Sequence, residues 1–170
     1  MPNLRIWFYD PSSDTEGVVN KLVAYADPPY CHCELQFPDG SACSIYMGSS
    51  VLMKKRVFDT TSYTLIEVSA SEEQVQHAYK SCIEARDLSI KFSSVQMLSC
   101  IYLWPSTSTN QKYTFCSKLI AKILVDASIL PDNTTVNITP SALHRLLEPL
   151  RNASSTCDAL DLKPGETLFI

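Results

Sequence analysis

The sequence predicts an α+β protein in which a central antiparallel sheet packs against helices. Residues 4–9 are rich in aromatic and β-branched side chains, and residues 30–37 alternate between two kinds of side chain, as strands do. Residues 113–124 instead carry apolar side chains at the spacing of one helix face. The length of 170 residues is enough to bury a sizeable core, so we expect residues 1–170 to form a single domain.

The first third of the chain predicts a strand, a helix and a hairpin. After the first strand, residues 13–16 (Ser-Asp-Thr-Glu) have the spacing of a capping box, and an apolar stripe follows as far as Ala26. After the second strand, Pro38-Asp39-Gly40 is typical of a tight turn. We expect this turn to lead into a returning strand over residues 41–47.

The register of the predicted hairpin determines which side chains of its two strands lie opposite each other. If the two strands pair directly at the turn, Glu34 lies opposite Ser44, and His32 lies opposite Tyr46 on the same face. The other face carries the apolar side chains Cys31, Cys33, Leu35 and Phe37. One face of the hairpin is therefore predicted to be core, and the other to carry polar chemistry.

The rest of the chain predicts more strands and four helices. Strands are expected at residues 51–53, 64–68 and 167–170. A capping box at residues 71–74 predicts the first of the helices, and the other three are expected over residues 95–104, 113–124 and 139–150. In the last of these, Thr139 is the expected N-cap and Pro140 the first helical residue.

Cys116 is the candidate nucleophile. With Thr114 as the N-cap, Cys116 lies in the first turn of its helix. Free N–H groups and the helix dipole stabilise a thiolate there, lowering the pKa of a cysteine below its ordinary value of about 8.5, and the same N–H groups can hold an oxyanion. Because cysteine is also a common buried structural residue, the catalytic interpretation requires a partner base.

Of the three histidines, His32 is the candidate base. His77 and His144 are expected on the solvent-facing sides of their helices. His32 lies mid-strand and shares its face with Glu34, so a carboxylate is available to orient the imidazole.

Composition excludes several other classes of function. The net charge of −4 and the isoelectric point of 5.3 argue against nucleic acid as a partner, and the basic run at residues 54–56 is expected to be a solvated strand edge. No apolar run approaches the roughly 20 residues of a transmembrane helix. Seven cysteines without framework spacing, after an N-terminus that lacks a signal-peptide pattern, predict a cytoplasmic protein with free thiols and no cofactor.

Three segments together resemble one family of enzymes. Tyr30-Cys31-His32-Cys33-Glu34-Leu35-Gln36-Phe37 with Asp39-Gly40 resembles the "SHxEL-F-DG" strand and turn of circularly permuted NlpC-type papain-like cysteine hydrolases, the branch of YiiX-like proteins and relatives of lecithin:retinol acyltransferase. Residues 113–120 resemble the "YxCSELV" helix start of that family, with Lys118 where the family has Glu, and residues 137–143 are similar to its "ITPSDL" segment. The segments occur in the permuted order, with the histidine strand before the cysteine helix.

The resemblance implies a permuted papain-like fold and acyl-transfer chemistry. Cys116 would be the nucleophile and His32 the base, with Glu34 as the first choice for the orienting residue and Ser44 as the second. The implied activities are those of a cysteine peptidase (thiol protease), an amidase or an acyltransferase, acting on a peptide, a lipid or an acyl-modified protein.

Two other classes of protein remain as alternatives. Cys31, Cys33 and Cys43 share a face in the expected register and could converge on zinc, although their spacing is not that of a common zinc motif. The chain could also be a catalytically inactive member of the family that acts as a binding module.

Overall fold

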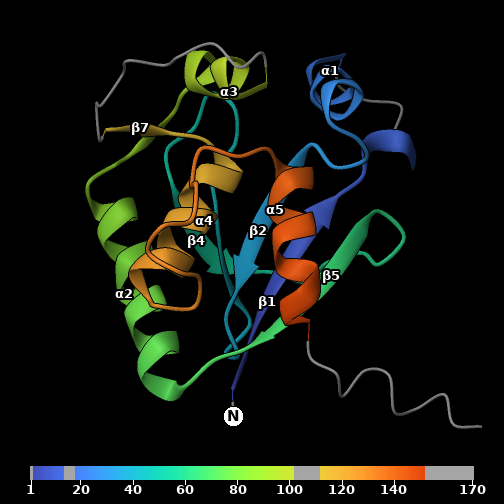
Figure 1. Ribbon diagram of the computed structural model, residues 1–170. Coiled ribbons are helices and arrows are strands. Elements are labelled where there is room, and N and C mark those ends of the chain that lie inside the picture. Colours follow the sequence, from blue (N-terminus) through green and yellow to red (C-terminus); the bar gives the residue numbers. More distant parts are fainter. Residues whose placement is uncertain (1, 14–17, 102–111, 152–170) are drawn as a thin grey trace, which may run out of the picture.

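The computed structural model describes residues 2–13, 18–101 and 112–151. They form a five-stranded antiparallel sheet in the order β4-β3-β2-β1-β5, with helices on one face (Figure 1). A separate two-stranded parallel pair joins β6 to β7. The expected α+β class with a central antiparallel sheet is therefore confirmed.

The strands of the main sheet follow the predicted order along the chain, with small differences in length. They are β1 (Asn3–Tyr9), β2 (His32–Gln36), β3 (Ser41–Ser44), β4 (Leu52–Lys55) and β5 (Tyr63–Ser69). The short parallel pair is made by β6 (Lys91–Phe92) and β7 (Tyr113–Thr114). The expected returning strand at residues 41–47 ends early, at Ser44, and the expected strand at residues 167–170 lies outside the described residues.

The register of the hairpin is confirmed. Leu35 pairs with Cys43, and the Phe37 N–H donates to the Ser41 carbonyl at 2.8 Å, so the strands pair directly at the turn. Gly40 has a φ of 83°, a left-handed conformation that glycine adopts without the steric cost of a Cβ. The turn chemistry therefore sets which residues of β2 face β3.

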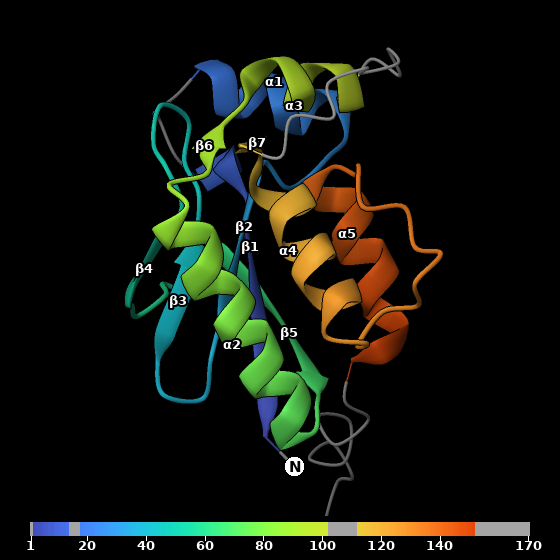
Figure 2. The same cartoon turned by 90° about the vertical axis from the view of Figure 1, so that its left-hand side faces the viewer.

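The helices form two groups. They are α1 (Val18–Ala26), α2 (Glu72–Asp87), α3 (Ser94–Ile101), α4 (Cys116–Asp126) and α5 (Pro140–Leu147), with 3-10 turns η1 (Pro11–Ser13) and η2 (Glu148–Leu150). Helices α2, α4 and α5 lie side by side over the sheet with α4 in the middle, and α1 and α3 lie together above the upper end of the sheet (Figures 1 and 2).

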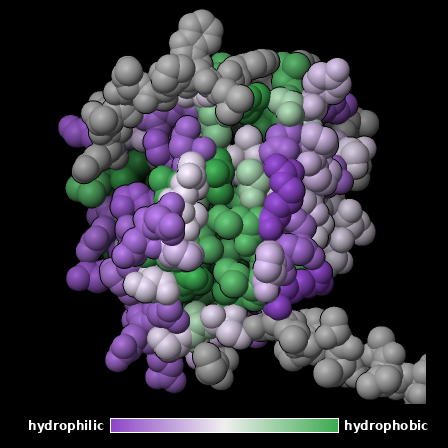
Figure 3. Space-filling view, in the orientation of Figure 1, coloured by the Kyte–Doolittle hydropathy of each residue, from purple (hydrophilic) through white to green (hydrophobic). Residues whose placement is uncertain are grey.

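Helix α4 is central because it buries most of its surface and leaves only a narrow stripe with Lys122 and Asp126 exposed. Leu119, Ile120, Ile123 and Leu124 are buried, together with Cys116 and Ala121. In the space-filling view, apolar side chains continue along the middle of this face, and hydrophilic residues of α2 and α5 flank them (Figure 3). A helix buried on so many sides holds its N-terminus in a fixed place over the sheet.

Of the four expected helix caps, two are confirmed, a third is wrong, and a fourth falls partly outside the described residues. The capping box at Ser71 opens α2, and Thr139 caps α5 through the Ala142 N–H. Thr114, the expected cap of α4, is instead part of β7, and the N-cap residue is Phe115. Thr114 is unavailable as a cap because its backbone pairs with β6. The expected capping box at residues 13–16 extends into residues 14–17, outside the described residues, and α1 begins at Val18.

Candidate active site at the start of α4

Cys116 is the first residue of α4. Phe115 precedes it in an extended conformation, with its side chain almost completely buried, and it offers no side-chain cap to the helix. The first hydrogen bond of the helix runs from the Leu119 N–H to the Phe115 carbonyl at 2.9 Å. The N–H groups before Leu119 have no acceptor within the helix, so they point toward the end of the helix that carries the Cys116 thiol.

The start of β2 is held by the last helix. The Ser141 hydroxyl, in α5, accepts the Tyr30 N–H at 3.0 Å and donates to the Asp27 carbonyl at 2.7 Å. Arg145 binds the Asp27 carboxylate at 3.0 Å. Ser141 belongs to the segment that resembles "ITPSDL", so this segment fixes the chain two residues before His32.

Cys116 and His32 line one cavity of about 210 Å³. The other residues that line it are uncharged: Tyr9, Val23, Cys31, Tyr46, Met47, Tyr63, Phe92 and Met97. A neighbouring cavity of about 260 Å³ between α1 and α3 shares Val23, Met47 and Met97 with it, and its lining carries no charged side chain. The Cys116–His32 pair therefore lies at a cavity of mixed polar and apolar lining, next to a second cavity whose lining is mostly apolar.

Two neighbours on β2 act on the Cys116 thiol. The Cys33 thiol donates a hydrogen bond to Cys116, and this is the largest influence lowering the pKa of Cys116 well below 9.0. Burial opposes the change, and the positive charge and hydrogen bond of His32 add to it. Burial would lower the pKa of His32, but the Cys116 charge and hydrogen bond, with Glu34, raise it to about 9. Cys116 and His32 therefore each stabilise the charged form of the other.

The neighbouring thiols behave in the opposite way. Burial and the charge of Cys116 raise the pKa of Cys31 to about 12. Burial, together with the hydrogen bond to Cys116, raises the pKa of Cys33 well above 9.0. Of these three thiols, Cys116 is the one whose pKa is lowered.

The far side of the His32 ring is held by the hairpin. Its Nε2 lies 3.1 Å from the Ser44 hydroxyl and 3.6 Å from Oε1 of Glu34. The ring stacks on Tyr46, with ring centroids 4.8 Å apart and planes 25° apart. Both candidates for the orienting role, Glu34 and Ser44, therefore reach the same ring nitrogen.

Glu34 is a buried carboxylate with partners of its own. Its side chain is 1% exposed, and Oε1 accepts from Nη1 of Arg56 at 2.7 Å, from the Tyr46 hydroxyl at 2.9 Å and from the Tyr63 hydroxyl at 3.5 Å. The negative charge of Glu34 and burial both raise the pKa values of Tyr46 and Tyr63, with burial the larger cause. These phenols therefore act as donors to the carboxylate.

The structure brings together the four candidate residues expected from the sequence, and it places Cys33 and Arg56 beside them. Cys116 and His32 line one cavity, and Glu34 and Ser44 lie next to Nε2 of the His32 imidazole. Cys33 was assigned to the core face, and Arg56 to a solvated strand edge. The position of Cys33 between His32 and Glu34, facing the helix that carries Cys116, is the signal that could have identified it.

The expectation for His144 is wrong. Its ring packs against Tyr30 and Phe8, with centroids 4.7 and 5.0 Å away, and its side chain is only 19% exposed. Burial accordingly lowers the pKa of His144. The helix turns this residue toward the aromatic side chains of the sheet. His77 is exposed, as expected.

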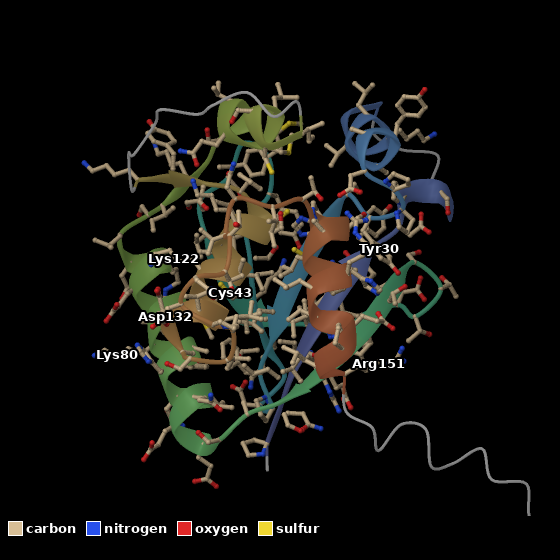
Figure 4. All side chains as sticks on the ribbon, in the orientation of Figure 1. Tyr30, Cys43, Lys80, Lys122, Asp132 and Arg151 are labelled. Atoms are coloured by element: carbon tan, nitrogen blue, oxygen red, sulfur yellow. The ribbon has the colours of Figure 1, made fainter. Side chains whose placement is uncertain are left out.

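The three cysteines of the zinc alternative do not converge. Cys43 hydrogen-bonds to Cys82 of α2, whereas Cys33 hydrogen-bonds to Cys116; Figure 4 labels Cys43 in the region of α4. Among the described residues, no group of three or more histidine, cysteine, aspartate or glutamate side chains has an arrangement that could bind a metal.

Comparison with models of protein families, with curated proteins and with solved structures finds no match to this chain. Within the part of the chain that the structure describes, no helix has the length and apolar character needed to cross a membrane.

Proposed function

We propose that this protein is a cysteine-dependent hydrolase or acyltransferase with a permuted papain-like arrangement. The observation that carries the proposal is the pairing of Cys116, at the first position of α4, with His32 of β2 at one cavity, where each shifts the pKa of the other toward the charged form. A cysteine or a histidine with a purely structural role in the core would not require a partner that stabilises its charged form.

The chemistry follows from the geometry. Nε2 of His32 faces Ser44 and Glu34, so the opposite ring nitrogen, Nδ1, is the one that exchanges a proton with Cys116. The thiolate attacks an ester or amide carbonyl, and the N–H groups of the first turn of α4 stabilise the oxyanion. The imidazolium protonates the leaving group. The acyl group then leaves Cys116 by transfer to water, in a hydrolase, or to another acceptor, in a transferase.

The cavity favours an uncharged substrate. Aromatic and apolar side chains surround Cys116, and the adjoining space between α1 and α3 is lined by residues such as Leu22, Leu98 and Ile101. A charged group next to the scissile carbonyl would be desolvated there without a partner. An acyl chain or an apolar side chain fits this lining better than a charged peptide does.

Site-resolved alkylation by iodoacetamide across pH tests the proposal directly. We expect Cys116 to react fastest of the cysteines near neutral pH, with a rate that rises at a pH well below 9.0, because His32 and Cys33 stabilise the thiolate. In His32→Ala the rise in rate should move to higher pH by about one unit or more, because the imidazolium no longer stabilises the thiolate. His77→Ala, which alters an exposed histidine, is the matched control.

Catalysis itself is tested with esters and amides that carry apolar acyl groups. Turnover should depend on pH as a bell, falling on the acid side as Cys116 takes up a proton and on the alkaline side near pH 9 as His32 loses one. Cys116→Ala should remove turnover and leave the unfolding temperature nearly unchanged. A Cys116 that reacts no faster than the other thiols, or a fully active Cys116→Ala protein, contradicts the proposal.

A further inference from the structure

Arg56 is a charged residue that the proposed reaction leaves without a role. It follows Lys54 and Lys55, whose side chains are exposed, but its own side chain is only 24% exposed and turns toward Glu34. Turning one member of a basic run inward carries a desolvation cost, which a specific ion pair can offset. Arg56 therefore differs from Lys54 and Lys55, because its inward position depends on a specific partner.

The surroundings of Arg56 hold it in one orientation. Its carbonyl accepts the Gln36 side-chain amide at 2.8 Å, and the Trp7 indole N–H donates to the oxygen of that amide at 2.8 Å. The guanidinium lies over the Phe58 ring, 4.9 Å from the centroid. The main chain and the side chain of Arg56 are thus both held in place, on the face of the sheet that carries His32.

The guanidinium makes a fork of contacts around the carboxylate. Nη1 binds Oε1 of Glu34 at 2.7 Å and contacts the Tyr46 hydroxyl, while Nη2 donates to the Tyr63 hydroxyl at 2.9 Å. The same Oε1 lies 3.6 Å from Nε2 of His32. A single carboxylate oxygen therefore stands between the cation of Arg56 and the imidazole of His32.

We propose that Arg56 is a positioning residue that balances the charge of Glu34 and thereby allows His32 to exchange its proton with Cys116. This inference rests on the proposed function of the Cys116–His32 pair. Without the guanidinium, Glu34 would face the imidazolium as an unbalanced buried charge, and His32 would hold its proton too tightly to act as an acid. With the guanidinium, Glu34 orients the ring and exerts a weaker pull on the proton.

Among the described residues, Arg56 is the only arginine or lysine that forms an ion pair with Glu34. Facing the imidazole or its partners from all packed elements are Tyr9, Cys31, Cys33, Glu34, Tyr46, Arg56, Tyr63 and Cys116. The Cys116 thiolate and Glu34 both favour imidazolium, and Arg56 opposes them. Removal of Arg56 or of Glu34 should thus change the proton affinity of His32 in opposite directions.

The experiment is an NMR titration of the His32 imidazole in the wild-type chain and in Arg56→Met, Glu34→Gln and the double variant. We expect the pKa of His32 to rise by about one unit in Arg56→Met, to fall by about one unit in Glu34→Gln, and to return near the wild-type value in the double variant. His77 is the internal control, since its exposed ring in α2 makes none of these contacts.

Arg56→Lys separates charge from packing. Lysine keeps the positive charge and loses the planar fork, so its His32 titration should stay close to wild type even where the unfolding temperature falls. A shift as large as that of Arg56→Met would assign the effect to packing and overturn the proposal. Shifts of the same sign in Arg56→Met and Glu34→Gln, or no shift in either folded variant, would also overturn it.

The titration does not depend on catalysis, so the two proposals can fail separately. Repeated in a Cys116→Ala background, the opposite shifts should persist around a lower starting pKa, because the thiolate no longer favours imidazolium. If the shifts persist but wild-type Cys116 shows no enhanced reactivity, the charge balance stands and the proposed function fails. If Cys116 is reactive and the shifts are absent, the proposed function stands and the role of Arg56 fails.

Discussion

The two faces of β2 are both buried, but one face carries apolar side chains and the other carries polar ones. Cys33 and Leu35 face the helices and are completely buried among apolar neighbours. Glu34 and Gln36, on the other face, are also more than 90% buried, yet each is tied to a named polar partner. A short strand thus contributes both to the core and to the candidate site, and the exposed fraction alone does not tell the two apart.

The difference lies in what burial does to free energy on each face. Removing Leu35 from water is favourable by itself. Removing the Glu34 carboxylate from water is costly unless every strong partner is present, and Arg56, Tyr46 and Tyr63 supply those partners. The helix-facing side therefore stabilises the fold, whereas the other side maintains a particular arrangement of charge.

The largest effect on stability should come from the helix-facing side. Leu35→Ala removes a fully buried side chain under α4, so the free energy of unfolding should fall by about 2–5 kcal/mol in urea denaturation. Leu35→Met, which conserves volume, should cost less than about 1.5 kcal/mol. The folded Leu35→Ala protein should still show the wild-type pH dependence of Cys116 alkylation. A changed dependence would mean that core packing and charge are not separable on this strand.

Cys33 is where the two faces overlap, because it packs in the core and donates to Cys116. Cys33→Ala removes the largest influence that lowers the pKa of Cys116, so the rise in alkylation rate should move to higher pH by about one unit. Cys33→Ser keeps a donor at this position and should move it less. Equal profiles for the alanine and serine variants would assign the effect to the lost volume of the thiol.

The smallest effect is expected at Ser44. Its hydroxyl is nearest to Nε2 of His32, but Glu34 and the stacked Tyr46 ring also hold the imidazole. Ser44→Ala should therefore lower the alkylation rate of Cys116 by less than about tenfold, the loss for one neutral hydrogen bond. Ser44→Thr, which retains the hydroxyl, is its control. A loss as large as in His32→Ala would make Ser44, rather than Glu34, the principal orienting residue.

The hairpin could be predicted from the sequence because its signals are local. Alternation assigns the faces of β2, and Pro38-Asp39-Gly40 sets the register, so the approach of Ser44 and Tyr46 to His32 and Glu34 follows from residues a few positions away. The placement of Cys116 at a helix start followed from helical periodicity in the same way. These signals lie within single elements, where sequence patterns are most informative.

What could not be predicted depends on contacts between distant elements. The cap of α4 is Phe115 rather than Thr114 because Thr114 pairs with β6, which is a tertiary constraint. In the sequence Arg56 is part of a basic run. That its side chain points inward follows only from the positions of Glu34 and Phe58 in the folded protein. His144 looked solvent-facing because the helical pattern does not reveal the aromatic rings against which α5 packs.

The bridge from Ser141 to Tyr30 has a consequence for when the site forms during synthesis. It joins residues 111 positions apart and anchors the chain just before His32, so the base strand receives this support only after α5 has left the ribosome. The nascent chain carries Cys116 before that point, but without the final anchor of its partner strand. We expect a truncation before residue 139 to lack the enhanced thiol reactivity, so that the protein acquires its reactive sulfur as a late event in its own production.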